Sequence, residues 1–308
     1  MKFGSYSAYY DQRNLLIPSI SVLIACIVAI TAHATSVFTE SVSFASSPRG
    51  HVLVPVSING SEPLIFVLDT GAGKTFITPG AAKELGLEEV PGDGASTLGV
   101  HGKSVNPEVE IQSIAVGEVL VADIQAIVLD LDHITRGNWQ ADGILGIDFL
   151  RQFDVRVDFG RSLVSFYSAA SDRSNCVACP ANIEGIVFET IDPGFIVLPV
   201  TIDTKPVNAL LDSGSGHSGI NGKTATALGV ALPQMPADAP TGHSFGIQTG
   251  PVRVGETTLT EQTPLFVMDH PLFESLGLAD RPSMLMGTDQ LKGRSVTVCY
   301  GLETLFLE

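Results

Sequence analysis

The chain has 308 residues, enough for two domains of ordinary size, each with its own hydrophobic core. It contains 31 Gly and 18 Pro, and only 16% of its residues are charged, a composition typical of many short strands joined by turns. We therefore expect an all-β protein and not a helical bundle. The formal net charge of −16 would repel phosphate backbones, which argues against a nucleic acid as partner.

Residues 1–34 form a predicted targeting segment. Basic residues flank a polar start, a mostly apolar stretch follows, and Ala32-His33-Ala34 supplies a small-x-small cleavage signal. The first interpretation is a cleaved signal peptide, and the alternative is a membrane anchor over residues 15–32, a stretch near the minimum length for spanning. A third is a lipoprotein, because the letters LIAC that end at Cys26 resemble a lipobox. All three place the globular part outside the cytoplasm, periplasmic, secreted or attached to a membrane.

The letters FVLDTGAGKT, residues 66–75, carry an apolar strand directly into an acid, Asp69, and then into glycines. A short helix is predicted to follow, because Thr78 before Pro79 is a typical helix start and Gly86 a typical helix end. The sequence thus predicts a carboxylate delivered from a buried strand into a tight turn.

Residues 169–184 are polar and form a predicted linker with a CxxC motif. Cys176 and Cys179 do not lie at a strand-to-helix junction, and no second pair completes a zinc site, so we predict a local disulfide or a staple of the linker. Cys299 lies in a strand-like run and is predicted to be a small buried hydrophobic residue. The odd number of cysteines after the leader leaves one thiol without an assigned role.

The chain repeats its first motif. The letters FVLDTGAGKTFIT recur as ALLDSGSGHSGIN, so that Asp69 matches Asp212 at an offset of 143. DGILGIDFL recurs as SMLMGTDQL, and VRVDFGRSLVSFY as VTVCYGLETLFLE, both at an offset of 141. A second short helix is predicted to open at Asn221 and to close at Gly229. The predicted lobes are residues 45–168 and residues 185–308.

Two equivalent acids on pseudo-symmetric lobes can meet face to face at the axis between them. At a separation of about 3 Å and an effective dielectric constant of about 20, two charged carboxylates would repel by about 5 kcal/mol, which is several pKa units. We therefore predict that Asp69 and Asp212 share one proton. The charged acid would take a proton from a water, and the neutral acid would donate to a scissile carbonyl oxygen, which gives a tetrahedral intermediate.

Residues next to the two acids are expected to support them. The hydroxyls of Thr70 and Ser213 can bond across the axis and hold the two loops together. Gly71 and Gly214 leave room for backbone N–H groups to reach the carboxylates, so a larger residue there should splay the pair.

Two more expectations concern the base and the strands below the loops. If the Ser215 hydroxyl donates to Asp212, it favours the charged form of that acid, so Asp212 is the predicted base and Asp69 holds the proton. The triplets Ile144-Leu145-Gly146 and Leu285-Met286-Gly287 are predicted to form the strand beneath each loop.

Two copies of hydrophobic-hydrophobic-D-[ST]-G-[AS], each followed by hydrophobic-hydrophobic-Gly about 75 residues on, resemble the aspartic proteases. They are most similar to the retropepsin-like branch, specifically to bacterial exported proteins with two aspartyl protease domains in one chain. The resemblance covers nearly all of residues 45–308. It implies a bilobal all-β fold, each lobe a small closed β-barrel with short helices, and two Asp carboxylates that share a proton are a known property of that family.

The same resemblance implies an aspartic endopeptidase, a hydrolase that cuts a peptide or unfolded protein with activated water and without a metal or another cofactor. Glycine-rich flap candidates begin at Gly94 and Thr241. Both lack the Tyr that pepsins carry there, so the sequence does not decide whether one flap or two operate. Because both halves lie in one chain, a monomer is sufficient for activity. The alternative is a catalytically silent peptide-binding protein with the same fold, but the intact acids and hydroxyls favour the enzyme.

Overall fold

The structure is a computed structural model that describes residues 39–99, 102–132, 135, 139–232, 244–268 and 270–308. These residues all belong to one compact unit of the chain. The predicted leader, residues 1–34, lies outside them. No helix within the described ranges is long and apolar enough to cross a membrane.

Six strands close into a barrel in the N-terminal lobe. They are β3 (Val52–Ile58), β4 (Leu64–Leu68), β5 (Phe76–Ile77), β8 (Glu108–Val116), β9 (Val119–Val128) and β10 (Gly143–Leu145). Neighbours are hydrogen-bonded in the order β3-β4-β10-β5-β9-β8, and β8 pairs again with β3, which completes the ring. Strand β2 (Ala45–Ser46) adds to β3 outside the ring.

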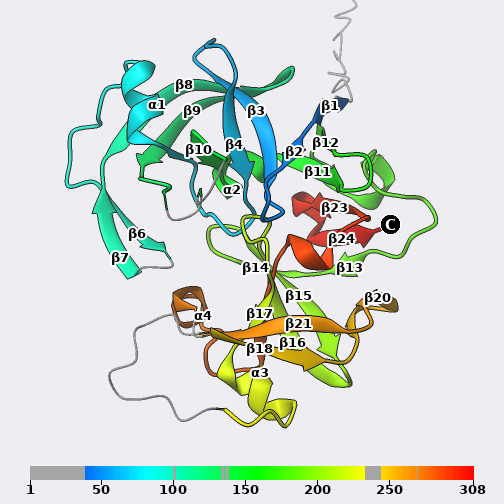
Figure 1. Ribbon diagram of the computed structural model, residues 1–308. Helices are drawn as coiled ribbons and strands as arrows, with labels where there is room; N and C mark the ends of the chain where they lie inside the picture. Colours follow the sequence, from blue (N-terminus) through cyan, green and yellow to red (C-terminus); the bar gives the residue numbers. More distant parts are fainter. Residues whose placement is uncertain (1–38, 100–101, 133–134, 136–138, 233–243, 269) are drawn as a thin grey trace, which may run out of the picture. The chain divides into compact units, whose positions relative to one another are not determined.

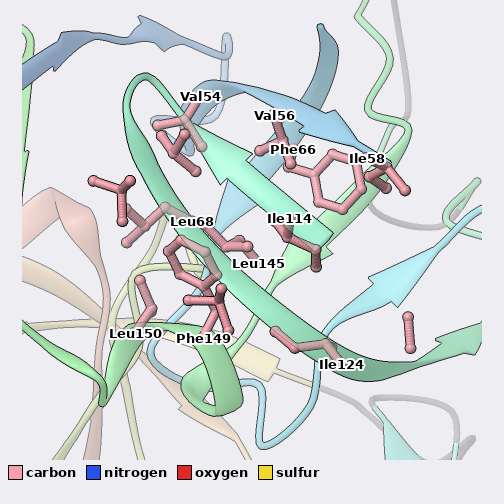
Figure 2. Close-up of a cluster of buried hydrophobic side chains, with 14 of the residues drawn as sticks. Val54, Val56, Ile58, Phe66, Leu68, Ile114, Ile124, Leu145, Phe149 and Leu150 are labelled. Atoms are coloured by element: carbon pink, nitrogen blue, oxygen red, sulfur yellow. The ribbon is translucent and has the colours of Figure 1, made fainter. Parts of the chain in front are cut away.

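Alternating side chains fill this barrel. In β8, Val109 and Ile111 are buried while Glu110 between them is exposed, because successive side chains of a strand point to opposite faces. Figure 2 shows apolar side chains of β3, β4, β8, β9 and β10 gathered with those of the helix α2 (Ile147–Leu150). Phe149 of this helix is fully buried in the cluster, so α2 is anchored to the core of the lobe.

The C-terminal lobe repeats the central arrangement in a nine-stranded sheet. Its strands are β14 (Glu189–Ile191), β15 (Phe195–Ile202), β16 (Lys205–Leu211), β17 (Gly219–Ile220), β18 (Ser244–Thr249), β19 (Val252–Val254), β20 (Thr257–Thr260), β21 (Thr263–Met268) and β22 (Ser283–Met286). The hairpin β15–β16 with β22 parallel to β16 corresponds to the hairpin β3–β4 with β10 parallel to β4. The predicted all-β, bilobal fold is confirmed.

The two lobes differ in their last hairpin. In the N-terminal lobe, β8 is one continuous strand. The corresponding segment of the C-terminal lobe is divided into β18 and β19 by Gly250 and Pro251, because proline cannot donate a ladder hydrogen bond. As a result β18 pairs with β21, while β19 pairs with β15 and β20. This sheet curls without closing into a ring of continuous strands. A closed barrel was expected for each lobe, and the structure has one in the N-terminal lobe and a curled sheet in the C-terminal lobe.

A six-stranded sheet joins the two halves of the chain. Its order is β1-β12-β11-β23-β24-β13, formed by β1 (Thr39–Ser43), β11 (Phe153–Asp158), β12 (Leu163–Ser168), β13 (Ile186–Val187), β23 (Ser295–Cys299) and β24 (Thr304–Leu307). The halves meet at the antiparallel pair β11–β23, where Val155 faces Val298 and Val157 faces Val296. The last strands of both halves therefore belong to a common sheet and not to separate lobes (Figure 1).

Two predicted short helices are confirmed with their caps. The helix α1 (Pro79–Glu84) begins after Thr78, whose side chain accepts from the Ala81 N–H, and α3 (Gly222–Ala227) begins after Asn221, which accepts from the Thr224 N–H. The glycines predicted to end them, Gly86 and Gly229, both have positive φ. The other short helices are α4 (Pro271–Ser275) and the 3-10 turns η1 (Arg173–Asn175), η2 (Thr288–Gln290) and η3 (Tyr300–Leu302).

Candidate active site

Each predicted acid follows directly on a buried strand. Asp69 comes after β4 and Asp212 after β16, so both strands end where the two loops begin. The Asp69 N–H donates to the Leu145 carbonyl of β10 (3.0 Å), and the Asp212 N–H donates to the Met286 carbonyl of β22 (2.9 Å). The strands predicted to lie beneath the loops are therefore hydrogen-bonded to the acids themselves.

The loops face each other so closely that their glycines contact the opposite acid. A Cβ atom added to Gly71 would lie 2.6 Å from the Cγ atom of Asp212, and one added to Gly214 would overlap the carboxylate of Asp69. The Gly71 N–H donates to Oδ1 of Asp69 (2.7 Å), and the two carboxyl groups are hydrogen-bonded to each other. The structure thus brings Asp69 and Asp212 together as one pair.

The neighbouring hydroxyls cross between the loops. The Thr70 N–H donates to Oγ of Ser213, and the Ser213 N–H donates to Oγ1 of Thr70, both at 3.0 Å. The Thr70 hydroxyl donates to the Leu211 carbonyl (2.9 Å), and the Ser213 hydroxyl to the Leu68 carbonyl (2.8 Å). Both side chains are buried, so four hydrogen bonds shielded from water tie one loop to the other.

The glycines of the two triplets lie against the backbone of the loops. A Cβ atom on Gly146 would collide with the Lys74 carbonyl, and one on Gly287 would lie 2.7 Å from the carbonyl oxygens of Ser215 and His217. Only a residue without a side chain allows this approach, so each triplet ends in glycine for a steric reason.

Both carboxyl groups are difficult to ionise. Burial raises the pKa of Asp69, against the effect of N–H groups that include that of Gly71. Burial and then the charge of Asp69 raise the pKa of Asp212 well above its ordinary value. The pair therefore retains a proton to higher pH than an isolated Asp would, and that proton belongs to the two acids together.

The structure does not have the hydrogen bond on which the prediction of Asp212 as the base rested. The prediction assumed that the Ser215 hydroxyl donates to Asp212, but that hydroxyl donates to the His217 carbonyl at 2.8 Å. Serine side chains commonly bond to backbone groups two residues away, which here removes the donor from the acid. Ser215 reaches Asp212 through its backbone N–H alone.

A second layer of polar residues, which the sequence reasoning missed, braces each loop. The Thr75 hydroxyl donates to Oδ1 of Asp148 (2.7 Å) and accepts from the Gly146 N–H (3.3 Å). In the other half the Ser218 hydroxyl donates to Asp289 (2.5 Å) and accepts from the Gly287 N–H (2.9 Å). The signal was present in the repeated letters, since Thr matches Ser and Asp matches Asp in the aligned copies.

A cleft with a volume of about 560 Å³ is lined by both carboxylates and by both halves of the chain. Much of its lining is apolar, including Phe76 and Ile127 from the N-terminal half and Phe195, Leu272 and Leu285 from the C-terminal half. The volume lies within the range of about 300 to 1,000 Å³ typical of ligand sites. The cleft can therefore hold apolar side chains beside a pair of acids.

The first flap candidate forms a hairpin at this cleft. Strands β6 (Ala95–Gly99) and β7 (Gly102–Asn106) form a sheet of their own, and residues 96–98 line the cleft. The hairpin projects from the barrel and contacts α4 (Figure 1). The second candidate differs, because its residues 241–243 lie outside the described ranges and its residues 244–249 form β18 within the nine-stranded sheet.

Two comparisons with known proteins found similarities to aspartic proteases. Residues 54–149, which include Asp69, β10 and Asp148, match the family described as aspartyl protease. Among solved structures, the chain is similar to a retropepsin-like aspartic protease from Rickettsia conorii, with 21% identity, a TM-score of 0.32, and coverage of 43% of this chain and 94% of that one. No curated protein matches the sequence. The match over residues 54–149 shows that the N-terminal lobe is similar to the aspartyl protease family.

Proposed function

We propose that the chain is an aspartic endopeptidase with Asp69 and Asp212 as its catalytic pair. The family and the fold support a protease-like function. The observation that carries the finer proposal is the meeting of the two carboxyl groups, each against the glycine of the opposite loop, in a cleft formed by both halves. A structural acid in a turn would need no such partner.

The one proton that the two acids share gives them different roles. The charged acid accepts a proton from a water that attacks the scissile carbonyl carbon. The neutral acid donates its proton to the carbonyl oxygen, so no separated charge develops in the tetrahedral intermediate. When the C–N bond breaks, the first acid gives its new proton to the leaving nitrogen. The second acid takes back the proton of the hydroxyl that becomes the new carbonyl, so the pair again holds one proton and is ready for the next water.

The cleft favours an extended peptide or an unfolded protein as substrate. Both carboxylates line it together with apolar residues from both halves, so a chain crossing it would present its backbone to the acids and its side chains to the walls. The hairpin β6–β7 is the proposed flap. A monomer holds every part of this site, and the predicted leader would place it in the periplasm, outside the cell or on a membrane.

Hydrolysis of an unfolded protein tests the proposal. We expect the full chain to cut a reduced and alkylated substrate at some pH between about 3 and 8, and Asp69→Asn and Asp212→Asn each to lower the rate by at least about 100-fold. Asp123→Asn is the matched control, because Asp123 is exposed and its positive φ suits asparagine. A pepstatin-type transition-state analogue should block the wild type.

Two outcomes would contradict the proposal. Equal hydrolysis by the wild type and both variants would mean that another group or a contaminant cuts the substrate. Tight peptide binding without any hydrolysis would instead support the silent peptide-binding alternative.

A further inference from the structure

Three cysteines far apart in the sequence meet at one point. Cys176 and Cys179 form a disulfide in the linker, as predicted, and Cys299 is a free, buried cysteine at the end of β23. The Sγ atom of Cys299 lies 3.6 Å from that of Cys176 and 3.7 Å from that of Cys179. The thiol that the sequence left without a role is therefore in contact with both sulfurs of the CxxC motif.

A buried carboxylate completes the cluster. Asp154 of β11 faces Cys299 across the strand pair, and its side chain lies beside the Cys299 thiol. Its Oδ2 atom accepts from the Ala170 N–H (3.2 Å) and lies 3.8 Å from Sγ of Cys176. Its Oδ1 atom is buried without a hydrogen-bond partner in the described part of the chain. An unpaired buried oxygen of this kind is costly and points to a missing ligand.

The spacing of the three sulfurs fits a tetrahedral metal site. With Zn–S bonds of about 2.3 Å and a Zn–O bond of about 2.0 Å, a tetrahedral ion would hold its sulfurs about 3.8 Å apart and sulfur and oxygen about 3.5 Å apart. The corresponding distances here are 3.6 and 3.7 Å between sulfurs. Asp154 Oδ2 lies 3.8 Å from the sulfur of Cys176, but Asp154 is outside the group of ligand atoms that all lie within 4.8 Å of one another, so its side chain must move to reach an ion held by the three sulfurs. The sulfurs of Cys176 and Cys179 lie closer only because they are bonded.

We propose that Cys176, Cys179, Cys299 and Asp154 form a site for Zn²⁺ or a similar thiophilic cation, open when the disulfide is reduced and closed when it forms. This replaces the sequence argument that no second cysteine pair completes a zinc site, since Cys299 and Asp154 supply the two missing ligands. Thiolate and carboxylate oxygen are both ordinary ligands of Zn²⁺.

The chemistry balances with a dithiol as reductant. The dithiol gives two electrons and two protons to the Cys176–Cys179 bond and becomes a disulfide itself, which leaves two protein thiols. Zn²⁺ then displaces one proton from each of three thiols, and the Asp154 carboxylate binds as the fourth ligand. The loaded site has a net charge of −2, which the Arg173 guanidinium, stacked on the ring of Phe306 in the same cluster, partly offsets.

Such an ion would bind three separate parts of the chain to one another. Asp154 comes from the N-terminal half, Cys299 from the C-terminal half, and Cys176 and Cys179 from the linker. The metal would therefore secure the β11–β23 junction in the reduced protein, as the disulfide and its contacts do in the oxidised one.

Cobalt binding tests the proposal. The experiment uses the full chain with Cys26→Ser, which removes the one cysteine of the predicted leader. This protein is reduced with a dithiol, the dithiol is removed under anaerobic conditions, and the reduced protein is titrated with Co²⁺. We expect one equivalent to bind with the thiolate-to-cobalt charge-transfer band and visible bands of a tetrahedral site, and Zn²⁺ to displace it. The oxidised chain should give none of these bands.

Matched variants identify the ligands. Cys299→Ser should weaken Co²⁺ binding by more than about 100-fold, and Asp154→Asn by about 10- to 100-fold, since an amide is the poorer ligand. Asp158→Asn is the control, because Asp158 lies on the same strand and faces Ser295 of β23 but lies outside the cluster. It should bind Co²⁺ as the parent does.

Four results would overturn the site. One is a reduced, folded chain that binds no Co²⁺, and another is binding that survives Cys299→Ser. The third is a chain that does not fold when reduced even in the presence of Zn²⁺, because a structural metal should restore folding. Peptide mapping that finds Cys299 in a new disulfide, with no metal bound, would assign the cluster to thiol exchange instead. All of these results are independent of proteolytic activity.

Discussion

The crossed hydroxyls of the two loops allow a quantitative test. Thr70→Val keeps the shape of the side chain and removes its oxygen, so no cavity is created. Two buried hydrogen bonds are lost, one to the Leu211 carbonyl at 2.9 Å and one from the Ser213 N–H at 3.0 Å. Each leaves a buried partner unsatisfied at a cost of about 1 to 3 kcal/mol, so we expect a loss of about 4 kcal/mol in the free energy of unfolding.

Urea unfolding followed by fluorescence and thermal unfolding followed by calorimetry would measure this loss. A destabilisation of about 4 kcal/mol should lower the melting temperature by about 6 to 8 °C in a protein of this size. Thr190→Val is the matched control, because the Thr190 hydroxyl bonds to Glu303 at the exposed surface and its loss should cost less than about 0.5 kcal/mol.

The reciprocal variant makes the test sharper. Ser213→Ala removes the acceptor of the Thr70 N–H and the donor to the Leu68 carbonyl, again two buried hydrogen bonds, and should cost about as much as Thr70→Val. If Thr70→Val costs no more than Thr190→Val, the crossed bonds do not hold the loops together, and the reasoning is refuted.

Three further results are expected. Gly214→Ala should abolish hydrolysis of a peptide substrate, because its Cβ would overlap the Asp69 carboxylate, whereas Gly246→Ala, with open space around it, should keep the rate; equal rates would contradict this. Asp148→Ala should cost about 3 kcal/mol in urea unfolding through two lost charge-assisted bonds to Thr75, and an unchanged midpoint would show that the brace is dispensable. Because the folded pKa of Asp212 is raised, the native state binds more protons than the unfolded one above the ordinary Asp range, so stability falls as pH rises through that window; Asp212→Asn should lessen this fall in melting temperature, and a variant that follows the wild type at every pH would refute it.

The parts of this protein that the sequence predicts are those set by local physics. Thr78 and Asn221 predict helix starts because a short polar side chain can accept from the first free N–H groups of a helix. The structure has the expected capping hydrogen bond at each of the two residues. The two acid loops were recognisable because an apolar strand, an acid and a glycine in fixed order recur in the same form. The disulfide between Cys176 and Cys179 could be predicted for the same reason, since only two residues separate the pair.

What the sequence could not predict depends on contacts between distant segments. The pairing of β11 with β23 joins residues about 140 positions apart, and no local pattern specifies which strand edge will meet which. The same pairing brings Cys299 to the linker and Asp154 to Cys299, so the cluster was invisible in a search for CxxC pairs. The argument for Asp212 as the base failed because one rotamer, that of Ser215, decides whether the hydroxyl bonds to the acid or to the His217 carbonyl.

The sheet shared by the halves also determines whether the acids can meet. In each half, the strand beneath the acid loop leads through one short helical turn, α2 or η2, into the strand of the junction, β11 or β23. The junction valines and the loop residues Thr70 and Ser213 line the same small cavity of about 30 Å³, so the sheet lies directly beneath the crossed hydroxyls. A slip of one residue in the β11–β23 register would move one loop by about 3.3 Å along the other and turn buried valines outwards. Two carboxyl groups cannot stay hydrogen-bonded over such a shift, because the bond holds only within about 0.5 Å of its usual length. The hydrophobic pattern that fixes this register therefore also fixes the distance between Asp69 and Asp212.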